Sequence, residues 1–460
     1  MEIAGLLITL VFGLALVNAV AYRLPVWEKI GYAWPMGLGA NALLMFMLDL
    51  MHISLRHVTG VLAVELALTI VLGVYIQRKY RPRLPEKSLL TIAAPRNLAW
   101  LLLMATVVFL VYVVTTRALF WPVYIYDSIY GFDFVAKAVA QEGTLNNAVF
   151  DPHHPLYSLR SLYPPLVALN FAFAYLLGFE TSHIIVVIFY ASLAVSLYAF
   201  LAQVTTPLGA AFYTLLLVTI PELFNFASLS SSNPICAYYC AMGLLALWRA
   251  VDTTCGLDLR MGAVLIALAL WTRPEAIIFA TVAGALVLWW SIKQKRIGAV
   301  VVVGVTFLAV WGSWQLYLQD VLHVTGDQPM DFDLTWDAGK LSRMLSRVME
   351  VTFHGSYYGI VMFLFVAVVF LNIPFLWKQR HTSLLLVVIV AAWGLYLLVF
   401  YQLDTDFMPN STDWIGDAYR RGMFNFIPLM LLYCAASPWS RTAFTGIERW
   451  LDADKSSVTE

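Results

Sequence analysis

The chain has 460 residues, of which 61% are hydrophobic and only 12% are charged, and its formal net charge is zero. A soluble protein carries roughly a quarter charged residues, and the short alternating strands of an outer-membrane barrel are not seen, so the composition excludes both classes. The neutral balance also gives no reason to expect a nucleic-acid partner. The sequence therefore predicts an all-α, polytopic membrane protein with the lipid bilayer as its first partner.

Apolar runs near the length that crosses a ~30 Å hydrocarbon core recur along the chain. The first has no basic region before it and no evident small-residue cleavage site, which predicts a retained helix rather than a signal peptide. We predict membrane segments at residues 1–22, 34–54, 58–77, 97–117, 163–178, 182–203, 207–222, 232–250, 260–272, 274–291, 298–318, 356–376, 382–401 and 423–437.

Three short connections concentrate Lys and Arg, at residues 78–87, 293–296 and 378–381. The positive-inside rule places them in the cytoplasm of a multi-pass protein of the cell inner or plasma membrane. Counting outward gives about 13 crossings, an outer N-terminus and a cytoplasmic C-terminus, provided that either 163–178 or 207–222 does not cross.

The same counting gathers the long acidic loops in one compartment. We expect accessory helices at residues 1–96, a catalytic module at 97–440 and a cytoplasmic tail at 441–460. The module includes outer loops at 117–163, 319–355 and 402–421. The tail begins with a short interfacial helix at 441–450. No CxxC pair occurs among the four cysteines, so we predict neither a disulfide nor a zinc site.

The first outer loop carries the strongest candidates for chemistry. Asp127 stands where the fourth segment should leave the membrane, and Asp133 follows six residues later. On a straight helix their side chains would point apart, but Gly131 permits a turn between them. A carboxylate at a membrane boundary among aromatic residues is partly desolvated and suited to accept a proton. An aromatic belt with solvated acids explains the same pattern.

Further along this loop, apolar and polar residues at 132–143 fall on opposite sides of a helix. This pattern predicts a short amphipathic helix that lies on the membrane surface and ends at Gly143. His153 and His154 follow beside Asp151, a set that suits a metal ion, although histidines between prolines are also ordinary loop residues. His154, Arg160 and Tyr163 are candidate substrate contacts.

Two further groups interrupt apolar sequence on the outer side. Arg273 and Glu275 flank Pro274, and we expect Arg273 to meet an anionic substrate group that Glu275 orients, unless the two simply pair with each other. Arg420 and Arg421 begin the last segment, after an acidic run that ends at Asp417. The planar guanidinium suits phosphate, and pairing with the nearby aspartates is the alternative.

These motifs come in a characteristic order. An acidic stretch at 126–143 is followed by YPPL at 163–166, a short helix reaching Pro221, SSNP at 231–234, TRPE at 272–275 and an Arg-bearing late helix with Pro428 inside it. In this order the chain resembles the GT-C superfamily of integral-membrane glycosyltransferases, in particular bacterial proteins similar to family 39, the protein-mannosyltransferase-like group. The resemblance covers roughly residues 97 to 440.

The resemblance implies transfer of a sugar, usually with inversion, from a polyprenyl-phosphate sugar to an acceptor on the outer face. The acceptor would be a glycan, a lipid or a protein. The acid expected to be catalytic falls on Asp127, with Asp133 as the second candidate. Relatives often pair acids directly in the first loop, whereas Ser128 follows Asp127 here, and Asn233 stands where an acid is often found. A divalent cation is therefore left open as a cofactor.

Two other functions use the same features. A polysaccharide polymerase or ligase also acts on lipid-linked sugars outside the membrane. A lipid or solute transporter would place its ionisable residues near the bilayer midplane, whereas here they cluster at segment ends on one side.

Overall fold

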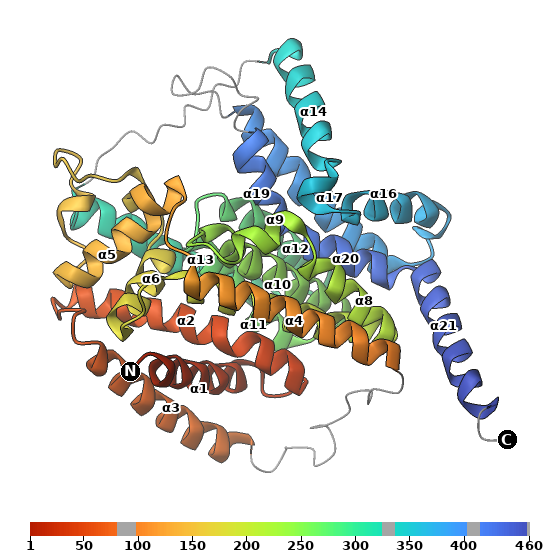
Figure 1. Ribbon diagram of the computed structural model, residues 1–460, viewed down its shortest axis with the longest axis horizontal. Helices are drawn as coiled ribbons and strands as arrows, with labels where there is room; N and C mark the ends of the chain where they lie inside the picture. Colours follow the sequence, from red (N-terminus) through yellow and green to blue (C-terminus); the bar gives the residue numbers. More distant parts are fainter. Residues whose placement is uncertain (81–97, 324–335, 403–414, 458–460) are drawn as a thin grey trace. The chain divides into compact units, whose positions relative to one another are not determined.

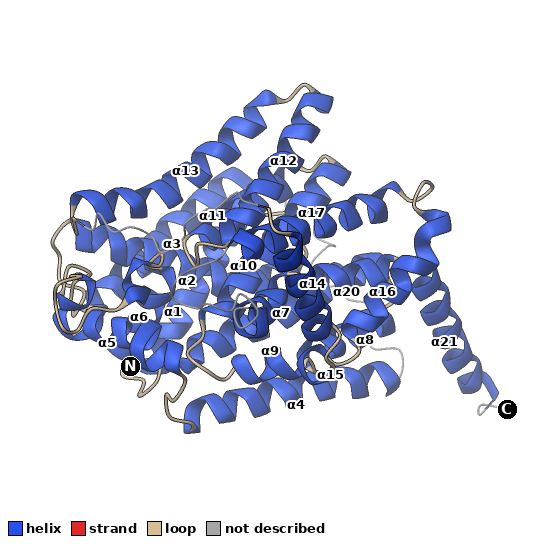
Figure 2. Ribbon diagram, turned by 90° about the horizontal axis from the view of Figure 1, so that it is seen from above, coloured by secondary structure: helices blue, strands red, loops and turns tan. Residues whose placement is uncertain are grey.

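The computed structural model describes residues 1–80, 98–323, 336–402 and 415–457, and every regular element in these ranges is a helix (Figures 1 and 2). The all-α prediction is confirmed. Nine of the described helices are long and apolar enough to cross a membrane: α1 (Glu2–Ala21), α2 (Val26–Leu50), α3 (Val58–Tyr80), α4 (Leu98–Phe120), α7 (His183–Val204), α10 (Ser232–Thr253), α12 (Ala276–Gln294), α13 (Ile297–Asp320) and α17 (Arg380–Gln402).

Each remaining predicted segment coincides with one or more shorter helices. They are α6 (Leu166–Leu177), α8 (Pro207–Val218), α9 (Pro221–Phe226), α11 (Gly256–Leu270), α15 (Gly355–Tyr358), α16 (Val361–Asn372) and α20 (Ile427–Ala436). Helices α6 and α8 have 12 residues each. They therefore rise about 18 Å and are shorter than a ~30 Å core.

Two segments predicted to be continuous are divided. Segment 207–222 stops at Val218 and resumes at Pro221, because the residue before a proline disfavours helical backbone. Segment 356–376 breaks at Gly359, whose φ of 59° lies in the left-handed region that glycine adopts without a side-chain clash. Both breaks lie near the ends of their segments.

The chain divides into two compact units, which we describe separately. Within the described residues, unit 1 contains 1–80, 114–193 and 226–323, and unit 2 contains 98–113, 194–225, 336–402 and 415–457. The first three helices thus belong to the same compact unit as the first outer loop. Their accessory role stays a prediction.

Unit 1 is fixed by close helix packing and by a buried ion cluster. A Cβ atom at Gly13 of α1 would lie 2.6 Å from the backbone nitrogen of Gly37 in α2, so only glycine at position 13 allows this approach. Elsewhere Arg249 of α10 donates two hydrogen bonds of 2.7 Å to Glu28 of α2 and bonds of 2.6 and 3.1 Å to Asp258 of α11. Glu28 and Asp258 are buried, so this cluster joins three helices inside the unit.

The amphipathic helix predicted at 132–143 is α5 (Asp133–Glu142), and Gly143 ends it with a φ of 77°. Its apolar residues Val135 and Val139 are buried, and α5 packs against α6. The apolar face is therefore occupied by protein, and the position of this helix on the membrane surface stays a prediction.

Unit 2 contains two further amphipathic helices, α14 (Ala338–Thr352) and α21 (Pro438–Ser457). Asp337 caps α14 by accepting a hydrogen bond of 2.7 Å from the Gly339 backbone, and the backbone amides of Gly339 and Lys340 lower the pKa of this carboxyl group. Parts of the predicted outer loops, residues 324–335 and 403–414, lie outside the described residues.

Candidate active site

The first outer loop begins with a turn that separates the two candidate acids. Asp127 precedes a wide helical turn at Ser128–Phe132, and Gly131 interrupts that turn with φ −133° and ψ −118° before α5 starts at Asp133. The turn that Gly131 permits is therefore present. As a result the Asp127 side chain keeps 19% of its exposure, whereas that of Asp133 keeps 2%.

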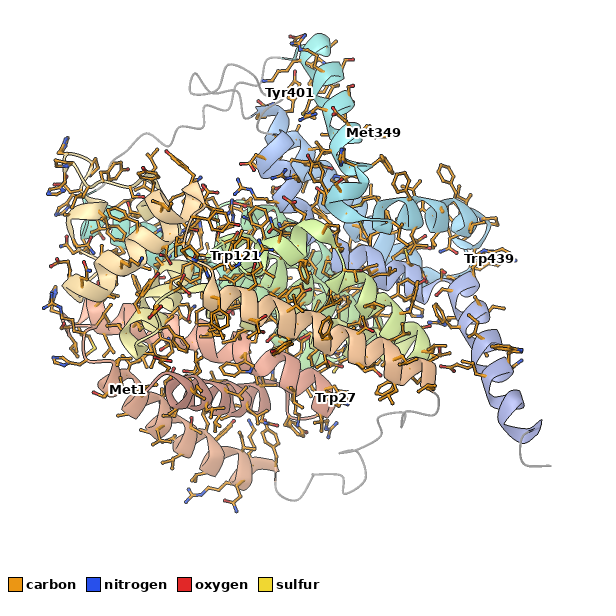
Figure 3. The ribbon with its side chains drawn as sticks, in the orientation of Figure 1. Met1, Trp27, Trp121, Met349, Tyr401 and Trp439 are labelled. Carbon is orange, nitrogen blue, oxygen red and sulfur yellow. The ribbon has the colours of Figure 1, made fainter. Side chains whose placement is uncertain are left out.

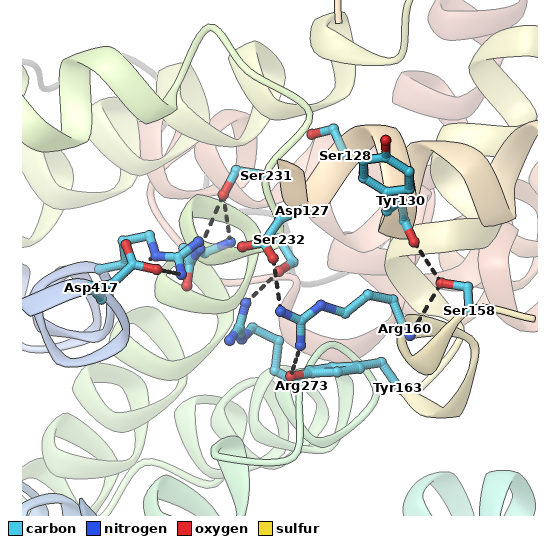
Figure 4. A network of polar contacts seen from close by, with 12 residues as sticks. Asp127, Ser128, Tyr130, Ser158, Arg160, Tyr163, Ser231, Ser232, Arg273 and Asp417 are labelled. Carbon is cyan, nitrogen blue, oxygen red and sulfur yellow. Dashed lines mark hydrogen bonds and ion pairs between the residues drawn. The ribbon is translucent and has the colours of Figure 1, made fainter. Parts of the chain in front are cut away.

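Asp127 is paired with Arg160, and the pair is visible in Figure 4. The Nη2 atom of Arg160 donates to Oδ1 of Asp127 over 2.7 Å, and its Nη1 atom donates to the Tyr163 hydroxyl, also over 2.7 Å. Burial alone would lower the pKa of Arg160, but Tyr163 and Asp127 outweigh that effect and raise it. The ion pair favours the ionised form of Asp127, which a proton acceptor requires.

Arg273 reaches the same tyrosine from the turn between α11 and α12. The guanidinium carbons of Arg160 and Arg273 lie 5.0 and 5.6 Å from the centre of the Tyr163 ring. Arg273 also donates to the Ser232 hydroxyl over 2.6 Å and forms an ion pair with Glu275. The predicted alternative, that Arg273 and Glu275 pair with each other, is thus observed. Two guanidinium groups of unit 1, each paired with a carboxylate, thus meet at one tyrosine.

Local sequence explains why these side chains meet. The Leu166 backbone amide donates to the Trp271 carbonyl over 3.1 Å, which ties the YPPL entry of α6 to the TRPE turn. Ser231 caps α10 by accepting from the Asn233 amide over 3.3 Å, which places Ser232 at the first turn of that helix. The order of motifs in the sequence therefore becomes a set of neighbouring turns in unit 1.

Asp133 has different surroundings. Its two carboxylate oxygens accept 2.6 Å hydrogen bonds from the hydroxyl groups of Tyr175 and Ser182, and Lys137 lies 3.4 Å away. Ser182 is also bonded to the Ser230 side chain at 2.9 Å. Because both oxygens are used and the residue is buried, these hydrogen bonds tie the first turn of α5 to Tyr175 and Ser182, and the catalytic role of Asp133 stays a prediction.

The histidines of the loop are exposed and hold a local turn. Nδ1 of His154 accepts from the Leu156 amide over 3.1 Å, and Asp151 accepts from the His153 amide over 2.9 Å. Within the described ranges, no group of three or more His, Cys, Asp or Glu side chains is placed to hold a metal ion. Both histidines therefore make local contacts within the loop, and the hydrogen bonds of His154 join it to Asp151, Leu156 and Tyr157.

In unit 2, Arg420 and Arg421 are both ion-paired. Arg421 bonds Asp417 at 2.6 Å, and Arg420 lies 2.8 Å from Glu222 of α9 and 3.6 Å from Asp417. The guanidinium of Arg420 also stands 4.9 Å from the centre of the Tyr357 ring. The pairing predicted as the alternative to phosphate binding is therefore present for both arginines.

Several residues of these networks were not expected from the sequence. Ser182, Ser230 and Tyr175 lie in no motif, because single hydroxyl residues are common in membrane helices and their partners lie far away in the chain. Ser232 lies in the SSNP motif, but nothing in that motif indicated its contact with Arg273. Glu222 gave a weak signal, since it is an acid directly after a proline at the end of an apolar segment.

The described helices define a multi-pass membrane protein. No protein-family model, no curated protein and no solved structure matches this chain.

Proposed function

We propose that this protein is a membrane glycosyltransferase that moves a sugar from a polyprenyl-phosphate carrier to an acceptor on the periplasmic or extracellular face. The observation that carries the proposal is the group formed by Asp127, Arg160, Tyr163 and Arg273. It combines a partly exposed carboxylate with two guanidinium groups about one aromatic ring. The order of motifs that resembles the GT-C superfamily supports the same chemistry.

In the proposed reaction, an acceptor hydroxyl attacks the anomeric carbon of the sugar as the bond from that carbon to the phosphate oxygen breaks. Asp127 takes the hydroxyl proton, and the bonding electron pair leaves with the phosphate. A base and a leaving group on opposite faces of the sugar give inversion. General-base catalysis of this kind contributes typically ~10² to 10⁴ in rate.

The arginines would stabilise the charge that develops on the carrier phosphate. Arg273 is held by Ser232 and Glu275, so its guanidinium is fixed before substrate arrives. Such preorganised donors avoid a reorganisation cost at the moment of reaction. Glu275 and Asp127 also offset the mutual repulsion of Arg273 and Arg160 before substrate binds. Phosphate binding by Arg420 and Arg421 would have to compete with Asp417 and Glu222, and it stays a prediction.

The test is a donor panel with the purified full-length protein in lipid nanodiscs. Polyprenyl-phosphate monosaccharides, pyrophosphate-linked oligosaccharides and nucleotide sugars are supplied separately with a mixture of glycan, lipid and peptide acceptors. Release of polyprenyl phosphate only from the first donor class, together with a glycosylated product, supports the proposal. Transfer only from the pyrophosphate-linked donor would make the protein a polymerase or ligase. Transport of the lipid without release would make it a transporter.

A further inference from the structure

A single residue, Ser437, separates the end of α20 from the start of α21 (Figure 1), and α21 packs against α8. The Phe444 ring lies 5.4 Å from Phe212 and 5.9 Å from Tyr213, measured between ring centres. Glu448 accepts a 3.1 Å hydrogen bond from the Leu208 amide. This side of α21 is therefore fixed to the rest of unit 2.

A second apolar stripe of α21 is exposed. Trp439, Ile447 and Trp450 keep 51%, 44% and 70% of their accessible surface. At 100° per residue these side chains fall within about 80° of the helix circumference, whereas Arg449 points roughly 160° away from Ile447. A narrow apolar stripe with tryptophan at both ends is typical of helices that lie in a membrane interface.

Three other helix ends meet α21 within unit 2. Arg441 donates to the Val204 carbonyl at the end of α7 over 2.6 Å. Trp439, labelled in Figure 3, donates over 3.2 Å to the Leu371 carbonyl near the end of α16, and its ring lies 6.4 Å from that of Phe375. Because α7, α16 and α20 are apolar helices that end here, the edge of the hydrocarbon core falls at the level of α21.

The turn after α16 also contains Trp377, which keeps 97% of its surface, followed by Lys378 and Arg380. A tryptophan next to basic residues is the pattern of a cytoplasmic membrane boundary. The exposed stripe of α21 thus continues an apolar rim that starts at the α16 to α17 turn.

We propose that α21 lies in the boundary between lipid headgroups and acyl chains on the cytoplasmic side, with Trp439, Ile447 and Trp450 buried in lipid. The bilayer surface covers the exposed stripe, and burial of its apolar area in lipid stabilises the contact. Residues 438–457 contain Arg441, Arg449 and Lys455 against Glu448, Asp452 and Asp454, so three positive and three negative charges cancel. Docking therefore does not depend on anionic lipid.

The test places one spin label at Ile447→Cys and, as a matched control, one at Arg449→Cys. The background carries Cys255→Ser, because the other three cysteines are buried. The full-length protein is reconstituted in nanodiscs of pure phosphatidylcholine and in nanodiscs with one-third anionic lipid. Collision rates are then measured with oxygen, which concentrates in lipid, and with a water-soluble nickel chelate.

We expect the ratio of oxygen to nickel collisions to be at least several-fold higher at position 447 than at 449, and unchanged by anionic lipid. Equal ratios at both positions would place the stripe in water and overturn the proposal. Protection of position 447 from both reagents would mean that protein covers the stripe, and would overturn it as well. If the two positions gave equal ratios in pure phosphatidylcholine but different ratios with anionic lipid, the contact would depend on charge, and this would contradict the proposal.

Discussion

Arg160 and Asp127 are 33 residues apart in the chain and form an ion pair of 2.7 Å in which the arginine also donates to Tyr163. The contact depends on Gly131. A Cβ atom at that position would lie 2.7 Å from Cγ of Arg160, closer than side chains normally approach. The Arg160 side chain thus passes close against the turn that separates the two acids.

The first prediction concerns this crossing. In Gly131→Ala, Arg160 must shift away from the turn, which weakens its contacts with Asp127 and Tyr163. Misplacement of a catalytic group by about 1 Å can cost ~10² in rate, so we expect turnover to fall at least tenfold. Steady-state transfer from the lipid-linked donor is the measurement. Gly284→Ala in α12 is the matched control, because nothing lies within 4 Å of its added Cβ, and it should keep wild-type turnover.

The second prediction separates Asp133 from Asp127. Asp133→Ala removes the acceptor of the half-buried Tyr175 hydroxyl and one of the two partners of the buried Ser182 hydroxyl, and a buried hydroxyl left unsatisfied costs roughly 1–3 kcal/mol. We expect a lower midpoint of thermal unfolding in detergent, with the folded fraction retaining turnover within a few-fold of wild type. If the Asp133→Ala protein folds but has no turnover, Asp133 is a catalytic residue and this prediction is wrong.

The third prediction concerns the ion cluster of Arg249 with Glu28 and Asp258. Arg249→Ala leaves two buried carboxylates unpaired, and breaking a buried pair costs ~3–5 kcal/mol. We expect a strong loss of thermal stability. Arg260→Ala, an exposed arginine of α11, is the control and should have little effect. If both variants unfolded at the same temperature as wild type, the cluster would not hold α2, α10 and α11 together.

The fourth prediction is that α6 does not cross the membrane. The Val204 end of α7 and the turn after α16 both contact α21, which places them on the same side as the basic turn at 378–381. Helix α7 has 22 residues and is long enough to cross, so we expect its other end outside. The sequence predicts that the first outer loop is also outside, so we expect α6 to begin and end on that side. Its 12 residues agree with this.

Cysteine labelling tests this topology. With an impermeant maleimide on intact cells, Glu142→Cys and Glu180→Cys should both react, while Lys293→Cys should react only after the membrane is opened. All three positions are exposed in the structure. Reaction of Glu142→Cys without reaction of Glu180→Cys would show that α6 crosses and that the count of about 13 needs another explanation.

The sequence predicted the helices well because apolar runs of this length have few alternatives in a membrane protein. It also predicted the turn at Gly131 and the helix end at Gly143. It did not predict the breaks within segments 207–222 and 356–376, and it did not predict the partners of Asp133. Those partners, Tyr175 and Ser182, lie 42 and 49 residues away, and nothing in a single sequence links residues at such distances.

The same limit applies to the carboxylate partners of Arg273 and Arg420. Sequence position suggested that Arg273 and Arg420 are available to phosphate, yet each has a carboxylate partner, Glu275 and Glu222. Local spacing predicted the first pair, since the two residues are two apart. The second joins helices that are distant in the chain, and only the folded arrangement brings it together.

The central claim is that Asp127 takes the proton from the acceptor. It is tested most directly by the single-turnover rate of sugar transfer from a polyprenyl-phosphate donor, compared between wild type, Asp127→Asn and the exposed-loop control Asp151→Asn. We predict that Asp127→Asn lowers the rate by about 10² to 10⁴ while donor binding stays within a few-fold of wild type, and that Asp151→Asn is unchanged. A wild-type rate in Asp127→Asn would contradict the account.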